Sequence, residues 1–200
     1  MYDTKESIRK RMWELLEREG ITGSNSYGRI PDFLGSHMAA NLLQNSREWK
    51  DTVTVFVSPD TAQLKVRENV LIDGKILIMA SPKLLNGYII IEPSWVKGYE
   101  REASTIGGAF KYGNKLETFP LIDMVVEGSV AVDKHGGRLG KGGGYGDMEI
   151  SNLNFHGAID ISTPIVSTVH EKQVIERVPM ESHDQEINMV VTQKRILKIK

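Results

Sequence analysis

Residues 53–80 read VTVFVSPDTAQLKVRENVLIDGKILIMA, and this stretch determines the class of the chain. It opens with the short β-branched run Val53–Val57, after which Asp60 is placed to cap a helix that Gly74 ends. A second apolar run closes the stretch. Strands that are apolar on both faces are typical of covered, mostly parallel sheets. Strand, helix and strand in such close succession therefore predict a βαβ unit.

The rest of the chain continues this alternation of helices and strands. Asp3 is placed to cap a first helix, with Glu6 as its capping-box partner, and Gly20 ends that helix. Further strands are expected at residues 88–92, 122–126, 130–132, 158–161, 164–169, 187–192 and, as an edge strand or tail, 195–199, with helices at 33–45 and 148–153. Segment 93–120 is expected to be a long functional loop or an insertion. We therefore predict one domain over residues 1–200, an α/β fold built as a three-layer α/β/α sandwich around a mostly parallel sheet.

Composition and charge exclude several classes of protein. Hydrophobic residues make up 40% of the chain and charged residues 26%, as in ordinary globular proteins. The net charge of −1 provides no chain-wide basic field for nucleic acid. The absence of cysteine excludes disulfides, zinc ribbons and thiol catalysis. Apolar runs such as Ile76–Ala80 are far shorter than the ~20 residues of a membrane helix, and no signal peptide is seen. We expect a cytoplasmic monomer or homodimer without membrane or nucleic-acid partners.

The most informative segment is glycine-rich and lies at residues 133–147, DKHGGRLGKGGGYGD. Seven glycines surround two cations, Arg138 and Lys141, between an apolar strand and an expected helix. Glycines allow backbone N–H groups to turn toward a ligand, and a following helix N-terminus adds positive potential. The segment therefore predicts a phosphate site, with a flexible surface hairpin as the alternative. It is not a Walker A motif, because Lys141 is followed by Gly142, and the G-x-G-x-x-G fingerprint does not register either.

Residues 138–147, RLGKGGGYGD, resemble the R-L-G-R/K-G-x-G-Y-Y-D signature of 5-formyltetrahydrofolate cyclo-ligases, also called methenyltetrahydrofolate synthetases. Shorter elements similar to those of the family occur in the same order, namely Lys5-Glu-Ser-Ile-Arg9, Gly74-Lys75, Asp123, Asp133, Gln173, Pro179 and Asp184. The resemblance implies a Rossmann-like three-layer fold, ATP and Mg²⁺. It also implies the family reaction, in which ATP phosphorylates the formyl oxygen of 5-formyltetrahydrofolate, the second folate nitrogen attacks, and phosphate leaves.

The resemblance further implies roles for individual residues. ATP would be held by Lys5, Arg9, Arg138, Leu139, Gly140, Lys141, Gly142, Gly143, Gly144 and Tyr145. Arg138 and Lys141 would also be catalytic, because phosphoryl transfer depends on positioning and on neutralising charge. The substrate would be contacted by Asp60 and Tyr145, and Mg²⁺ would be held by Asp147 and Asp184.

Each of these residues also has a purely structural interpretation. Lys5 and Arg9 fit a solvated basic face of the first helix. Asp147 fits the N-cap of the helix that follows the glycine-rich segment, and Asp184 fits an exposed loop carboxylate. Tyr145 fits a packing tyrosine. Both interpretations remain open at the level of the sequence.

The folate side of the family pattern is altered. Gly146 replaces the second tyrosine of the signature, and Asp60 stands where the family has a glutamate that contacts the folate. The predicted function is ATP- and Mg²⁺-dependent conversion of 5-formyltetrahydrofolate to 5,10-methenyltetrahydrofolate. The expected partner is a small-molecule substrate, a reduced folate or a similar compound. The alternatives are a nucleotide-binding paralogue that acts on another cofactor-like substrate, and a non-catalytic nucleotide-binding module.

Overall fold

A central sheet of eight strands organises the computed structural model, which describes residues 4–23 and 25–199. The strand order is β11-β10-β8-β5-β1-β2-β3-β4. The strands are β1 (Thr54–Val57), β2 (Ile76–Ala80), β3 (Tyr88–Ile91), β4 (Asn114–Lys115), β5 (Met124–Glu127), β8 (Ile165–Thr168), β10 (Met189–Val191) and β11 (Ile196–Lys198). The middle strands β10, β8, β5, β1 and β2 are parallel, whereas the pairings β2–β3, β3–β4 and β10–β11 toward the two edges are antiparallel.

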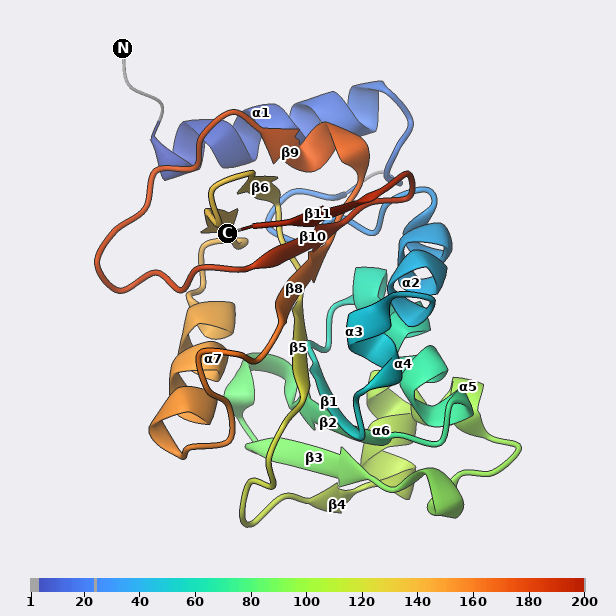
Figure 1. Cartoon of the computed structure of the whole chain (residues 1–200). Helices are drawn as coiled ribbons and strands as arrows, with labels where there is room; N and C mark the ends of the chain where they lie inside the picture. Colours follow the sequence, from blue (N-terminus) through green and yellow to red (C-terminus); the bar gives the residue numbers. More distant parts are fainter. Residues whose placement is uncertain (1–3, 24, 200) are drawn as a thin grey trace.

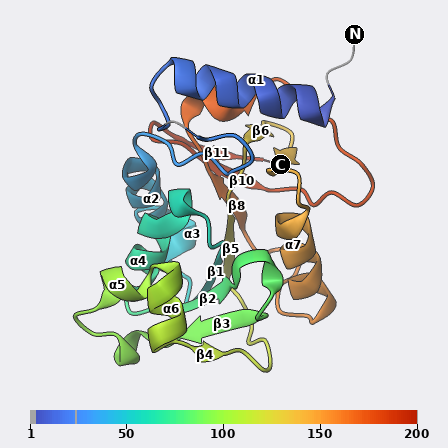
Figure 2. The ribbon, with the colours of Figure 1, turned by 180° about the vertical axis from the view of Figure 1, so that it is seen from behind.

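Helices cover both faces of this sheet (Figures 1 and 2). One face carries α2 (Ser36–Gln44), α3 (Arg47–Lys50), α4 (Leu64–Ile72), α5 (Glu100–Ala103) and α6 (Ile106–Tyr112), and the other carries α7 (Tyr145–Phe155). The alternation along β1 explains this arrangement. Val55 and Val57 join the core that includes α2 and α4, whereas Phe56 packs with Ile150 and Leu153 of α7. The predicted three-layer α/β/α sandwich with a mostly parallel sheet is confirmed.

A second, smaller sheet lies beside the carboxyl ends of the central strands. It has the order β7-β6-β9, with β6 (Ala131–Asp133), β7 (Arg138–Leu139) and β9 (Val174–Ile175). Helix α1 (Lys5–Arg18) lies over this sheet and buries Ile8, Met12 and Leu16 in the main core (Figure 1). Thr4 caps α1 through a hydrogen bond from the Ser7 N–H, and the cap expected at Asp3 lies outside the described residues.

Short 3₁₀ turns complete the described structure, at η1 (Thr61–Gln63), η2 (Pro82–Leu84), η3 (Pro93–Trp95) and η4 (Glu171–Gln173). Two expectations are wrong. Segment 93–120 is not a long loop, because it folds into η3, α5, α6 and β4. The alternative expectation, that this segment is an insertion, stays a prediction. Residues 158–161 form no strand, because Gly157 turns the chain out of α7 at φ 65° and the Ala158 carbonyl then accepts from the Ile122 N–H. The expected edge strand near the C-terminus is present as β11.

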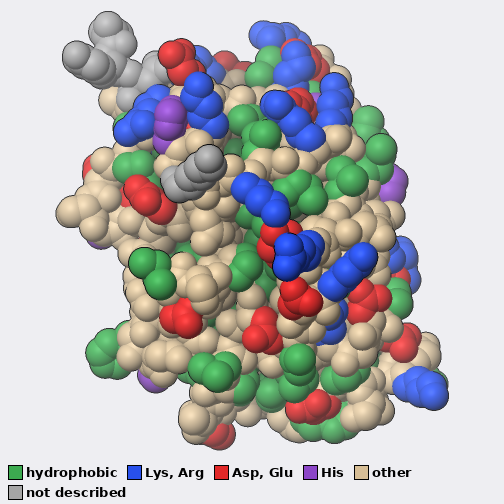
Figure 3. All heavy atoms as spheres, in the orientation of Figure 1, with side chains coloured by type: hydrophobic (Ala, Val, Ile, Leu, Met, Phe, Trp, Pro, Cys, Tyr) green, Lys and Arg blue, Asp and Glu red, His purple; other side chains and the backbone are tan. Residues whose placement is uncertain are grey.

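Charge is distributed without a dominant sign. On the face shown in Figure 3, Lys and Arg side chains are interspersed with Asp and Glu, in keeping with the net charge of −1. Within the described residues, no helix is both long enough and apolar enough to cross a membrane.

Candidate functional site

A cavity of about 310 Å³ opens at the carboxyl ends of β1 and β5. Its walls are formed by the apolar side chains of Ile30, Pro59, Pro82 and Ile106 and by the glycine-rich loop that joins β7 to α7, and its charged lining consists of Arg29, Asp60, Lys83, Glu127, Arg138, Lys141, Asp147 and Glu149. Ligands of open α/β sheets bind at this edge, because loops leave the parallel strands there. The cavity is therefore the candidate site.

The turn between β6 and β7, which precedes the glycine-rich loop, is anchored by Asp133, buried at the end of β6. Its Oδ1 accepts from the N–H groups of His135 and Gly137 at 2.7 and 2.9 Å. The loop then runs to Gly144, which precedes α7 with φ at 68°, while Gly142 has φ at 106°. These two positions favour glycine because side chains rarely adopt that backbone region. The first turn of α7 thus presents its free N–H groups beside the cavity.

Arg138 lies in a buried position on the wall of the cavity, with 3% of its surface exposed. Its Nη2 donates to Asp147 Oδ1 at 2.6 Å, and its Nε has no partner within the part of the chain that the structure describes. The guanidinium occupies the space where a side chain at residue 146 would begin. A Cβ atom at Gly146 would lie 2.8 Å from Arg138 Nη1 and 3.1 Å from Nη2. The glycine therefore makes this position of the arginine possible.

Lys141 lies across the cavity mouth from β1, and its Nζ donates to Asp60 Oδ1 at 2.8 Å. The expected capping role of Asp60 is wrong, because its side chain makes no cap hydrogen bond and binds Lys141 instead. Buried Arg67 of α4 holds this turn in place. Its Nη1 donates to the carbonyls of Ser58 and Asp60, its Nε donates to the Ser104 carbonyl, and burial lowers its pKa to about 10. A charged group on α4 thus fixes the position of the Asp60 carboxylate.

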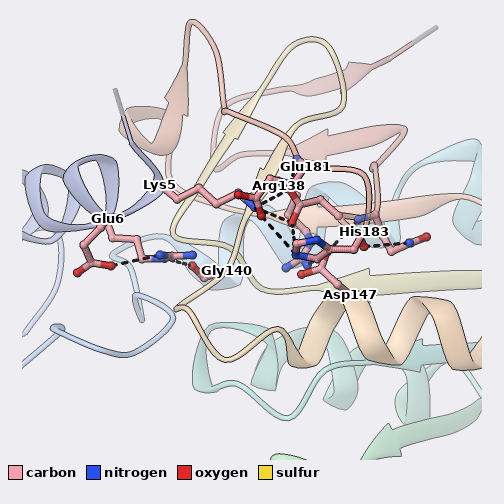
Figure 4. A network of polar contacts seen from close by, with 10 residues as sticks. Lys5, Glu6, Arg138, Gly140, Asp147, Glu181 and His183 are labelled. Carbon is pink, nitrogen blue, oxygen red and sulfur yellow. Dashed lines mark hydrogen bonds and ion pairs between the residues drawn. The ribbon is translucent and has the colours of Figure 1, made fainter. Parts of the chain in front are cut away.

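Helix α1 reaches the same site from the other end of the chain. Arg9 Nε donates to the Gly140 carbonyl of the glycine-rich loop at 2.8 Å (Figure 4). Lys5 Nζ donates to both oxygens of Asp184 at 2.8 and 2.6 Å and to Glu181 at 3.0 Å. Burial opposes the charge of Lys5, but these hydrogen bonds raise its pKa. The structure therefore brings Lys5 and Arg9 toward the loop, although Arg9 and Gly140 are 131 residues apart in the sequence.

A backbone hydrogen bond brings together the two expected magnesium ligands, Asp147 and Asp184. The Gln185 N–H donates to Asp147 Oδ1 at 3.0 Å, so the residue after Asp184 touches the Asp147 carboxylate. Glu181, His183 and Asp184 also each offer a ligand atom within 4.8 Å of the others. Carboxylate oxygens are the ligands that Mg²⁺ prefers. The donor set fits this ion, with Lys5 now pairing Asp184 and Arg138 pairing Asp147.

Leu139 and Tyr145 differ in what they present to the site. The Leu139 side chain is 2% exposed and belongs to the core, and its carbonyl accepts from the Val130 N–H. Leu139 is paired with Ala131 in the smaller sheet and is not among the residues that line the cavity. The Tyr145 ring lines the cavity, and it lies so close to Gly143 that a Cβ there would be 2.6 Å from its Cε2.

The chain matches known proteins over almost its whole length. The model of the 5-formyltetrahydrofolate cyclo-ligase family matches residues 2–193. The chain belongs to this family. Methenyltetrahydrofolate synthase domain-containing proteins of Mus musculus and Homo sapiens are 34% and 33% identical to it over 204 residues, which is 97% of the chain. The chain spans about half the length of these relatives, 55% and 53%.

Proteins whose names state a cyclo-ligase or synthetase activity are also similar, in part or in fold. The 5-formyltetrahydrofolate cyclo-ligase of Escherichia coli (strain K12) is 32% identical over 75 residues, 38% of each protein. The NMR structure of the Aquifex aeolicus 5,10-methenyltetrahydrofolate synthetase gives a TM-score of 0.62 at 22% identity, covering 98% of this chain and 93% of that one. The latter similarity shows that the cyclo-ligase family fold extends over the chain.

Two residues of this cyclo-ligase family member were not foreseen from the sequence. Glu127 ends β5 and Glu149 lies on α7, and both line the cavity with 2% and 3% of their surfaces exposed. Burial raises the pKa of Glu127 well above its ordinary value, and the nearby Glu149 carboxylate raises it further. Burial raises the pKa of Glu149 to about 7, against a hydrogen bond from Glu127 that lowers it. The sequence signal was a glutamate at the carboxyl end of an otherwise apolar strand.

A larger hollow of about 750 Å³ lies along α1, away from these groups. It is lined by Ile8, Arg11, Met12, Glu14, Leu15, Arg18, Lys172, Ile175, Glu176, Arg177 and Pro179. No residue with a predicted site role is among them, so the smaller cavity remains the candidate site.

Proposed function

We propose that this chain uses ATP to convert 5-formyltetrahydrofolate to 5,10-methenyltetrahydrofolate. The observation that carries the proposal is the convergence of three cations on one glycine-rich loop. Arg9 binds the loop carbonyl of Gly140, Arg138 lies behind the loop, and Lys141 lies at its tip facing Asp60. Loop N–H groups, a helix N-terminus and several cations form a receptor for a polyphosphate. Membership of the cyclo-ligase family supports the same choice of reaction.

The proposed chemistry conserves every atom of the two substrates. The formyl oxygen attacks the γ-phosphorus of ATP, and the bond to ADP breaks. The second folate nitrogen then attacks the activated formyl carbon and loses its proton, and the original formyl oxygen leaves as part of inorganic phosphate. Phosphoryl transfer needs positioning and charge neutralisation more than covalent help. Arg138 and Lys141 supply that neutralisation once phosphate oxygens take over from their present partners, Asp147 and Asp60.

Release of Arg138 would free the Asp147 carboxylate for a metal ion, and release of Lys5 would free that of Asp184. Asp147 and Asp184 would hold Mg²⁺, which neutralises phosphate charge when it is bound. Glu181 lies beside Asp184 and shares Lys5 with it. In the described site, phosphate oxygens of ATP could therefore replace the carboxylates beside the cations. Mg²⁺ could in turn replace the cations beside the carboxylates.

The test is a turnover assay with ATP, Mg²⁺ and 5-formyltetrahydrofolate, in which the absorbance of the methenyl product is followed. We expect turnover that needs both ATP and Mg²⁺, and a much weaker Mg²⁺ response in Asp147→Asn and Asp184→Asn. Asp51→Asn is the matched control, since this exposed carboxylate follows α3 and precedes β1, at the opposite edge of the sheet. An unchanged Mg²⁺ response in both site variants would contradict the metal assignment.

A second candidate function is favoured by the altered substrate side of the cavity. Gly146 provides no aromatic ring, and the buried carboxyl groups of Glu127 and Glu149 line the floor. A nucleotide-binding paralogue would turn over a different cofactor-like substrate with the same loop. In that case ATP binds, phosphate is released only with another substrate, and no methenyl product forms. ATP binding without any turnover would indicate a non-catalytic nucleotide-binding module.

A further inference from the structure

Two buried polar atoms on the cavity wall have no hydrogen-bond partner among the described residues. One is an acceptor, Oε1 of Glu127, and the other is a donor, Nε of Arg138. Both residues line the cavity, and both are at least 97% buried, with 2% and 3% of their surfaces exposed. A buried polar atom without a partner costs about 1–3 kcal/mol. Such atoms at a cavity wall are supplied with partners by what the cavity binds.

Glu127 is one half of a carboxyl pair with Glu149. The two carboxyl groups line the same cavity from β5 and α7, and both are almost fully buried. Replacing a buried polar cluster by apolar residues is often neutral or stabilising, so a buried acid pair is poorly explained as a stability element. The pair instead places acceptor oxygens on the wall of a cavity that also has the apolar surfaces of Ile30, Pro59, Pro82 and Ile106. Its natural guest is a flat ring with N–H groups along one edge.

We propose that Glu127 and Glu149, together with Arg138 Nε, recognise the 2-amino-4-oxopyrimidine edge of the substrate's bicyclic ring. That edge carries an exocyclic amino group and a ring N–H, which are donors for carboxyl oxygens, next to a carbonyl, which is an acceptor for the arginine. Ile30, Pro59, Ile106 and Tyr145 provide the apolar surface for its faces. Under the proposed function, on which the identity of the ring rests, the edge belongs to the pterin of the folate.

The pair also accounts for a substrate contact that Asp60 does not make. The Asp60 carboxylate is held at the cavity mouth by Lys141 at 2.8 Å, so it is engaged with the phosphate side of the site. Glu127 and Glu149 lie deeper, on β5 and α7. The same edge occurs in guanine, so a guanine nucleoside is the other source of this chemistry.

The direct test is binding of small pteridines to the full chain, followed by quenching of their fluorescence. Pterin carries the 2-amino group, whereas lumazine has an oxygen at the same position and would face the carboxyl oxygens with an acceptor. We expect wild type to prefer pterin over lumazine by roughly tenfold to a hundredfold, the scale of a hydrogen bond to a charged group. Glu127→Gln and Glu149→Gln should abolish most of that preference. Glu68→Gln, a buried glutamate outside the cavity, is the matched control.

Three outcomes would overturn the proposal. Equal affinity of wild type for pterin and lumazine would show that the protein does not recognise the 2-amino group of the ring edge. An unchanged preference for pterin in both glutamine variants would show that groups other than Glu127 and Glu149 recognise the ring edge. Tighter binding of guanosine than of pterin would assign the cavity floor to a nucleoside. If a variant fails to fold, as judged by its thermal unfolding, the wild-type preference alone still decides the first and third outcomes.

The proposal and the proposed function fail in different ways. Pterin selectivity in wild type without methenyl formation would remove the reaction and retain the recognition element. Methenyl formation with the same KM for 5-formyltetrahydrofolate in wild type, Glu127→Gln and Glu149→Gln would retain the reaction and overturn the recognition element. The KM for ATP should not change in either variant.

Discussion

A side chain at residue 146 would occupy the same space as the Arg138 guanidinium, beside the N-terminus of α7. The distances between them predict how a substitution at Gly146 changes the stability of the fold. In Gly146→Ala the added Cβ would lie 2.8 Å from Arg138 Nη1, closer than real Cβ contacts. The arginine is 3% exposed and is paired with Asp147 at 2.6 Å, so it moves only by giving up that pair. Overpacking of this kind costs about 1–3 kcal/mol. Alanine in a helix gains about 1 kcal/mol over glycine.

The clash should offset or exceed this gain, and Gly146→Ala should lower the free energy of unfolding by up to about 2 kcal/mol. Urea unfolding of a four-member cycle with Arg138→Ala isolates the cause. Without the guanidinium the nearest atoms to the new methyl group are gone, so the same change should stabilise the Arg138→Ala protein. Gly107→Ala is the matched control, because Gly107 is also the second residue of its helix, α6, and nothing lies within 4 Å of its Cβ position.

The reasoning would be refuted if Gly146→Ala had the same effect on the free energy of unfolding in both backgrounds. It would also be refuted if Gly146→Ala stabilised wild type as much as Gly107→Ala does. Either result would mean that Arg138 does not occupy the space over Gly146. A coupling of about 1–3 kcal/mol between the two sites, equal to the cost of the overpacking, is the expected result.

Three further predictions follow from contacts of single residues. Lys141→Ala should weaken ATP binding by about 1.5–3 kcal/mol in a calorimetric titration. Lys111→Ala, which removes an ion pair with exposed Glu102, should leave ATP binding unchanged. Equal losses of affinity in the two variants would contradict the assignment of Lys141 to the ATP site. Because the raised pKa of Glu127 lets the folded chain keep a proton that the unfolded chain releases, stability should fall as pH rises above the ordinary glutamate pKa. Glu127→Gln should flatten that slope by up to about 1.4 kcal/mol per pH unit in urea unfolding, and parallel slopes would disprove the burial argument. Arg67→Met should cost about 3 kcal/mol or more, since three carbonyls lose their donor, and a loss under about 1 kcal/mol would be inconsistent with those contacts.

Local pattern was sufficient for the central part of the fold. The apolar runs that became β1, β2 and β8 are short, are bounded by turn residues and are buried on both faces, so their period and their ends agree. The pattern failed at residues 158–161, where an apolar run leaves a helix instead of joining the sheet. Burial alone does not distinguish these two situations, because both hide apolar side chains.

In the candidate site, too, local sequence pattern predicted one part and missed another. The glycine-rich loop was visible in the sequence because backbone freedom and interleaved cations leave a compositional trace. The approach of Arg9 to Gly140 was reached only through resemblance, since no local pattern specifies a contact across 131 residues. Glu127 and Glu149 were missed because a glutamate has the same letter whether it is solvated or buried. Their chemistry comes from tertiary packing, which places β5 and α7 on either side of the cavity floor.

The most direct measurement follows the formyl oxygen itself. 5-Formyltetrahydrofolate labelled with ¹⁸O in the formyl group is incubated with the protein, ATP and Mg²⁺, and the inorganic phosphate is analysed by mass spectrometry. The proposed chemistry predicts one ¹⁸O atom in the phosphate for each methenyl product formed, because the formyl oxygen leaves bonded to phosphorus. Unlabelled phosphate, with the ¹⁸O released into water or retained in the folate, would contradict it.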